Sequence, residues 1–170
     1  MSIATPCSPI TPTVCEDLGY RLVSVSRLSE ICNPFVEPPW KDVEALTVQC
    51  VLQAMQDEIR QPDSYSDGGL SKSWTVDNHI ARIAHLAASG WSDPIEVDVG
   101  VPFLNCWVDW PVIDGNHRLA AAMVRGDKYI LSSIAGSCDY MRERLGRFLP
   151  SATQPSHASP WAPRIHMVNE

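Results

Sequence analysis

The chain has 170 residues and a formal net charge of −7, and 45% of its residues are hydrophobic. This length fits one ordinary domain with its own core, and the acidic balance excludes a protein that coats nucleic acid by bulk electrostatics. No apolar run approaches the roughly 20 residues that a membrane-spanning helix requires, so we expect no membrane insertion.

The two ends of the chain carry few signals of regular structure. Both are rich in proline with small polar residues, so we predict a flexible arm over residues 1–18 and a Pro-rich, extended tail over 150–170. One domain would then occupy residues 19–149. The six cysteines show no metal-ligand spacing and follow no leader, which favours reduced thiols in a cytoplasmic protein.

Between the ends, apolar periodicity predicts an alternation of strands and helices. Alternating or continuous apolar runs predict strands over residues 20–28, 95–99, 108–113 and 129–134. Apolar residues at helical spacing predict helices over 41–59, 76–88, 116–125 and 139–148, with a polar loop over 63–73. The expected fold class is α/β in the broad sense (α+β), a compact domain with a small mixed sheet flanked by helices.

The most informative segment is Asp114-Gly115-Asn116-His117-Arg118, which joins an apolar run to an alanine-rich one. An Asp-Gly pair between apolar runs also signals a β-hairpin. The Leu-Ala-Ala-Ala-Met run that follows has high helix propensity, so we predict a strand-to-helix turn. A helix start offers unpaired backbone N–H groups and partial positive charge, and an arginine adds a guanidinium that matches a phosphate. We therefore expect this segment to bind a phosphate.

Three features together resemble the ParB/sulfiredoxin superfamily over about residues 20–137. They are the helix His-Ile-Ala-Arg-Ile-Ala at 79–84 with the glycine at 90, the strand from Pro94, and the Gly-Asn-His-Arg-Leu-Ala-Ala turn. Members share a compact α/β domain in which this turn and its helix hold the phosphates of ATP or CTP. The resemblance implies that Gly115, Asn116, His117 and Arg118 bind a nucleoside triphosphate, together with Mg²⁺ or another divalent ion.

Two departures from the superfamily narrow the expected activity. Asn116 stands where sulfiredoxins carry their reactive cysteine, so sulfinic acid reduction lacks its nucleophile. The segment after Ile134 is too short for the helix-turn-helix domain of ParB partition proteins. The single-domain branch that remains includes nucleotide hydrolases, small-molecule kinases and plasmid-borne proteins with ATPase and DNA-cleaving activity. The resemblance thus implies an ATPase, with DNA as a further substrate and inhibition of plasmid DNA transfer as a role.

The expected roles have structural alternatives. Arg118 and His117 would stabilise charge on the phosphates, and Glu96 would guide the attacking water. Asp98 lies on the same polar strand face as Glu96 and is the candidate metal ligand. Alternatively, Arg118 forms a structural ion pair with Asp114, and the two strand carboxylates are simply solvated. A non-enzymatic regulator that senses a nucleotide and binds a protein partner through the Pro-rich ends also fits.

Other polar and aromatic residues receive no chemical role at this stage. His79, Arg82 and His85 are expected on the exposed side of their helix. Burial is the commoner fate of the six tryptophans, although an aromatic face can also stack on a base. Trp110, which lies just before the turn, is the tryptophan that we would test.

Overall fold

The computed structural model describes residues 14–15, 20–41, 43–63, 74–146 and 149–150. The strands are β1 (Val14–Cys15), β2 (Tyr20–Ser24), β3 (Ile95–Asp98), β4 (Val112–Asp114), β5 (Tyr129–Ser137) and β6 (Leu149–Pro150). The helices are α1 (Val25–Ile31), α2 (Val48–Gln56), α3 (Val76–Ser89), α4 (Asn116–Arg125), α5 (Cys138–Leu145) and the 3-10 helix η2 (Pro102–Leu104). Nearly all of the expected loop over 63–73, arm and tail lie outside the described residues.

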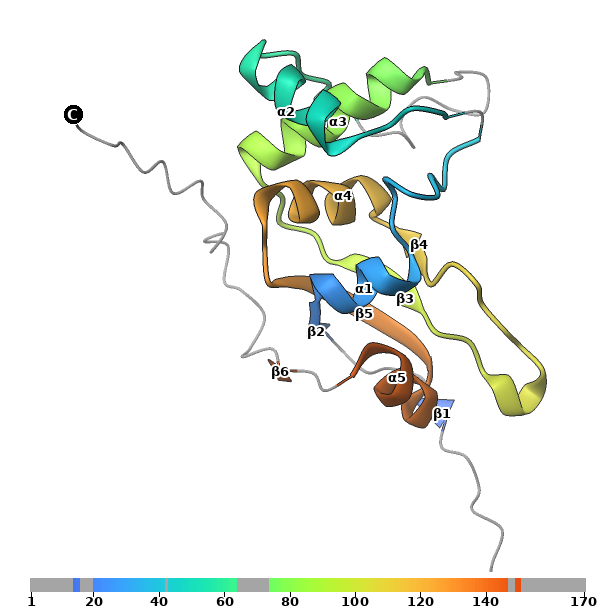
Figure 1. Ribbon diagram of the computed structural model, residues 1–170. Coiled ribbons are helices and arrows are strands. Elements are labelled where there is room, and N and C mark those ends of the chain that lie inside the picture. The colour runs from blue at the N-terminus through green and yellow to red at the C-terminus, as the bar shows by residue number, and fades with distance from the viewer. Residues whose placement is uncertain (1–13, 16–19, 42, 64–73, 147–148, 151–170) are drawn as a thin grey trace, which may run out of the picture.

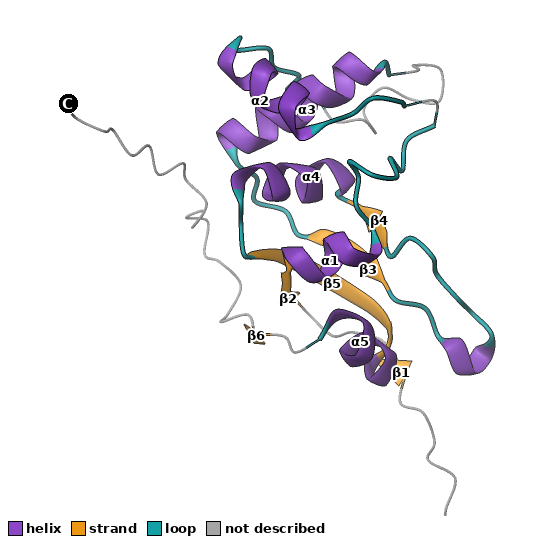
Figure 2. Cartoon of the chain, in the orientation of Figure 1, coloured by secondary structure: helices purple, strands orange, loops and turns teal. Residues whose placement is uncertain are grey.

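The strands form a mixed sheet in the order β4-β3-β5-β2-β6, and β1 pairs with the end of β5 (Figure 1). β3 runs parallel to β5, whereas β2 is antiparallel to β5 and β4 is antiparallel to β3. Helices α2, α3 and α4 lie on one side of this sheet (Figure 2). The predicted α+β fold class is therefore confirmed. β1 and the second residue of β6, Pro150, fall within the segments expected as arm and tail, so those three residues do form regular structure.

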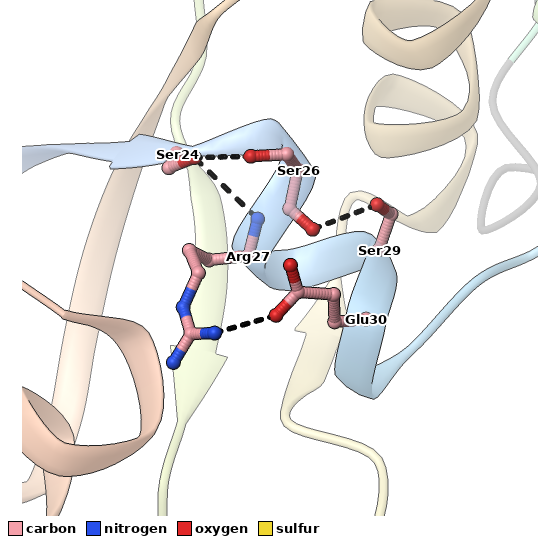
Figure 3. Close-up of polar contacts among 5 residues, drawn as sticks. All are labelled: Ser24, Ser26, Arg27, Ser29 and Glu30. Carbon is pink, nitrogen blue, oxygen red and sulfur yellow. Dashed lines mark hydrogen bonds and ion pairs between the residues drawn. The ribbon is translucent and has the colours of Figure 1, made fainter.

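The first predicted strand ends earlier than expected. It stops at Ser24, whose side chain accepts a hydrogen bond from the backbone N–H of Arg27 at 3.4 Å and so caps α1. Within α1, the guanidinium of Arg27 pairs with Glu30 at 2.5 Å (Figure 3). The predicted strand over residues 20–28 was wrong beyond Ser24, because an N-cap serine ends the extended backbone.

The first predicted helix begins later than expected. α2 starts at Val48, since Thr47 is extended (φ −129°, ψ 155°) and its hydroxyl accepts the N–H of Cys50 at 3.2 Å. Ala45 has φ 61°, which a right-handed helix does not contain. The prediction of a helix over residues 41–59 was wrong outside α2, although the apolar residues before the helix are buried all the same.

The remaining elements agree with the sequence more closely. α4 has the predicted bounds, α3 is one residue longer than predicted and ends at Gly90, and β3 lacks only the last predicted residue. β4 is shorter than the predicted 108–113, because the chain before it forms a projecting loop that contains η2. β5 extends to Ser137, and α5 begins immediately afterwards.

Two hydrophobic cores meet at α4. One lies between the sheet and helices α1, α4 and α5, and it contains Leu119 and Ala122 of α4. The other lies among α2, α3, α4 and the loop before α2, and it contains Ala120 and Ala121. All four of these α4 residues have no exposed surface. Small side chains let α4 pack closely on both sides, and this packing holds the start of the helix in place.

The structure bears on two expectations, the reduced state of the cysteines and the lack of a membrane-spanning helix. Cys138 is disulfide-bonded, so the expectation of six reduced thiols was wrong at this position. Spacing alone cannot reveal such a pairing. Cys32, Cys50 and Cys106 are free, and burial raises the pKa of Cys32 to about 11. None of the helices in the described part of the chain is long and apolar enough to cross a membrane.

Candidate functional site

The strand-to-helix turn at Gly115 is the structural centre of the site. Gly115 has φ 91° and ψ 20°, and it is the N-cap of α4 directly after β4. A Cβ at this position would lie 2.5 Å from Cγ2 and 2.8 Å from Cβ of Ile95, which is buried in β3. The turn therefore requires glycine both for its backbone conformation and for its close contact with β3. The predicted turn is confirmed, and the hairpin alternative is excluded.

The start of α4 opens into a cavity. The N-cap of this helix is a glycine, so no N-cap side chain accepts a hydrogen bond from the first turn, whose backbone N–H groups also lack intrahelical acceptors. The cavity has a volume of about 640 Å³, within the usual range for small-molecule sites. Its lining comes from the loop before α2, from α3, from the loop between α3 and β3, from β3 and β4, and from the start of α4.

Arg118 lies in the first turn of α4 and lines the cavity. Its side chain is 16% exposed and forms an ion pair with Asp114, whose carboxylate is largely exposed. A second guanidinium N–H donates to the backbone carbonyl of Asp93 at 3.3 Å. The structural pair that was the alternative for Arg118 is thus present. Asp114 also lines the cavity, so the pair lies in its wall.

Asn116 has a structural task in the turn. Its amide oxygen accepts a hydrogen bond from the indole N–H of Trp110 at 2.8 Å, and its amide nitrogen donates to the carbonyl of Val112 at 3.1 Å. These contacts tie the first turn of α4 back to β4. Trp110 is therefore a support for the turn, and it is not among the residues that line the cavity.

His117 is part of a cluster of imidazole and indole rings. Its Nε2 lies 2.8 Å from Nδ1 of His79, so one of the two nitrogens donates and the other accepts. The ring of Trp40 stacks on His117 with centroids 4.3 Å apart, and Trp74 meets His79 edge to face at 5.5 Å. Burial is the main cause that lowers the pKa of both imidazoles, that of His79 to about 4. Both rings are therefore neutral near pH 7, and of the two, His117 lines the cavity.

Two residues of α3 were misplaced by sequence reasoning. His79 is only 1% exposed and Arg82 lines the cavity, whereas both were expected on the exposed side of the helix. The Arg82 guanidinium donates to the carbonyls of Gln61 and Pro62, which anchors it beside the site. Positions 79, 82 and 86 follow one stripe of α3 at helical spacing. The spacing of His79, Arg82 and Leu86 on one side of α3 was the sequence signal that could have shown that the two polar residues face the site.

The two candidate carboxylates of β3 differ in their placement. Glu96 lines the cavity, while Asp98 does not, and Oδ1 of Asp98 accepts the backbone N–H of Gly100 at 2.8 Å. The described residues contain no group of three or more His, Cys, Asp or Glu side chains that could hold a metal ion.

Charges of both signs line the cavity. Arg82 and Arg118 line the same space as Asp93, Glu96 and Asp114.

No family model matches the chain, and comparisons with curated proteins and with solved structures give no match either.

Proposed function

We propose that the chain binds a nucleoside triphosphate, ATP or CTP, in this cavity and hydrolyses it with Mg²⁺ or another divalent ion. The observation that carries the proposal is the first turn of α4, which has no N-cap side chain and contains Arg118, opening into a cavity of about 640 Å³. Backbone N–H groups and the helix dipole favour an anion at that point, and a guanidinium offers paired hydrogen bonds to phosphate oxygens.

The charges around the cavity support a divalent ion. Three carboxylates near a bound triphosphate would repel it unless a cation lay between them. Mg²⁺ is commonly held by one or two carboxylates and the phosphates of the substrate, with water completing its shell. Glu96 and Asp114 line the cavity on adjacent strands and face each other in the register of β3 and β4. We assign them, in place of Asp98, as the carboxylates nearest to such an ion.

In the proposed reaction, water attacks the γ-phosphorus, the bond from that phosphorus to the bridging oxygen breaks, and the nucleoside diphosphate leaves. Arg118 and the α4 N–H groups would stabilise the charge on the phosphates, and Arg82 would add a second cation. Glu96 would orient the water. DNA cleavage and a plasmid-associated role extend the same proposal through the resemblance to the superfamily, since phosphodiester cleavage needs similar charge stabilisation.

One observation favours a second candidate, a regulator that binds the nucleotide without turnover. His117 is neutral near pH 7 because burial lowers the pKa of its imidazole, and its Nε2 is already bonded to His79. Its imidazole therefore supplies no positive charge to the phosphates, and its expected part in stabilising them is limited to hydrogen bonding. If the site binds the nucleotide but releases no phosphate, the regulator is the correct function.

A titration of the intact chain with radiolabelled ATP and CTP in the presence of Mg²⁺ tests the proposal. Binding and phosphate release are both measured, with Arg118→Ala as the test variant. The control is Arg142→Ala, because Arg142 is exposed on α5 and pairs with Asp139 away from the cavity. We expect Arg118→Ala to lose binding and release, and the control to keep both.

Absence of binding by either nucleotide to the wild-type chain would refute the proposal. The DNA extension is tested in the same preparations with supercoiled plasmid. Nicking that disappears in Arg118→Ala and persists in Arg142→Ala would support it, and nicking that is equal in all three would identify a contaminating nuclease.

A further inference from the structure

We propose that Trp91 is the stacking platform for the base of the bound nucleotide and that the site prefers a purine. This inference rests on the proposed function and adds to it the part of the cavity that selects the base. Trp91 lies in the loop between α3 and β3 and lines the cavity. The proposed phosphate binding at the Gly115 turn does not involve Trp91, so a role in binding the base is a separate assignment.

The ring of Trp91 is held in a fixed position. It is half-buried and packs against both hydrophobic cores of the domain. The guanidinium of Arg125, in the last turn of α4, lies over the ring with its central carbon 5.3 Å from the ring centroid. A cation over an indole face is a stabilising contact that helps to keep the ring ordered, and Trp91 still contributes to the lining of the cavity. A preordered aromatic surface loses little conformational entropy when a base stacks on it.

The position of Trp91 relative to Arg118 suits a mononucleotide. Arg118 donates to the backbone carbonyl of Asp93 at 3.3 Å, so the guanidinium is attached to the same loop that carries Trp91. Two residues of extended chain span at most about 7 Å. The carbonyl that holds the guanidinium and the backbone of Trp91 therefore belong to one short stretch of chain, and Leu86 and Pro94 add apolar lining to the same cavity.

The other described tryptophans are less suited to stack on a base. Trp40 lines the cavity but is 8% exposed, and its ring is stacked on His117. Trp110 is bonded to Asn116, and neither it nor Trp74 nor Trp107 lines the cavity. Trp91 is the one of these rings that lines the cavity without another ring stacked on it within the described part of the chain.

Stacking on the Trp91 ring indicates which class of ligand the site prefers. Stacking on an aromatic side chain accepts every base and is stronger for a larger ring system. The preference is therefore for a purine nucleoside triphosphate over a pyrimidine one. An inorganic triphosphate would use the α4 end of the site alone and gain nothing from Trp91.

The experiment compares ATP, UTP and inorganic tripolyphosphate, each with Mg²⁺, by equilibrium titration of the full chain. We expect wild-type protein to bind ATP more tightly than UTP and tripolyphosphate, with tryptophan fluorescence quenched by ATP and not by tripolyphosphate. In Trp91→Leu, ATP affinity should fall about 5- to 150-fold, and tripolyphosphate affinity should stay unchanged. The control is Trp107→Leu, since Trp107 is 61% exposed on the projecting loop.

Because Trp91 packs against the cores, Trp91→Phe provides a variant that keeps a ring in the same place. It should retain wild-type tripolyphosphate binding, bind ATP with intermediate affinity and lose the ATP-dependent quenching. Equal affinities of wild-type protein for ATP and tripolyphosphate, or a Trp91→Phe variant that still shows the quenching, would overturn this inference and leave the proposed function standing. Failure of wild-type protein to bind any of the three ligands would refute the proposed function itself.

Discussion

Replacing Gly115 by alanine should destabilise the domain more than the same replacement at any helix end without a close contact. The added Cβ would lie 2.5 Å from Cγ2 of Ile95, and real Cβ atoms do not approach another heavy atom so closely. Ile95 has no exposed surface and belongs to the core under the sheet, so it cannot move aside. The Nε of Arg118 lies 3.0 Å from the same Cβ, so this side chain would also have to shift.

The magnitude has two parts. The left-handed conformation at φ 91° costs a non-glycine residue about 1–2 kcal/mol. Forcing an additional carbon into a packed core costs about 1–3 kcal/mol more. Gly115→Ala should therefore lower the free energy of unfolding by about 2–5 kcal/mol, a large share of the stability of a domain of this size.

The matched control is Gly126→Ala at the other end of α4. Gly126 has φ 71°, and no heavy atom lies within 4 Å of the place that an added Cβ would occupy. It should lose only the conformational part, about 1–2 kcal/mol, and the change in unfolded-chain entropy is the same for both variants. Urea unfolding followed by circular dichroism gives both values. If the two variants lose equal stability, the contact between Gly115 and Ile95 does not constrain the turn, and the reasoning is refuted.

Three further predictions concern the ion pair and the buried imidazoles. Asp114→Asn removes the carboxylate that competes for Arg118, so tripolyphosphate binding without divalent metal should tighten by up to about fivefold in calorimetric titration; unchanged affinity would show that the pair does not compete. His79→Leu removes the buried His79 imidazole, which bonds a partly buried nitrogen of His117, and should cost about 1–3 kcal/mol in urea unfolding; a loss below about 0.5 kcal/mol would contradict this role. Because burial lowers the pKa of His79 to about 4, the unfolded chain binds a proton first as the pH falls, so stability should decrease from about pH 6.5 to pH 4. The slope should be shallower in His79→Leu, and an identical slope would mean that His79 does not titrate in this range.

The local signals of the chain were sufficient for the turn and the helix that follows it. A glycine between an apolar run and an alanine-rich run predicts a strand-to-helix junction, and α4 has the predicted bounds. α3 was predicted almost as well because its apolar spacing and its terminal glycine both lie within or directly beside the helix. By contrast, β2 and α2 were predicted too long. Ser24 caps α1 and so ends β2, and Thr47 caps α2 and so sets its late start, but apolar periodicity does not register such side-chain caps.

The environment of the site came from contacts between segments that are distant in the chain. Periodicity identifies a buried face, but it cannot show that a second layer covers the polar stripe of the same helix. His79 and Arg82 were therefore misplaced, although α3 itself was predicted correctly. The bond between His79 and His117 joins residues 38 positions apart, and no local pattern encodes it. The strand-to-helix turn is thus a property of a short segment, whereas the cavity, with the neutral imidazole of His117 and its tryptophans in the lining, arises from the packing of α3, α4 and the loops around them.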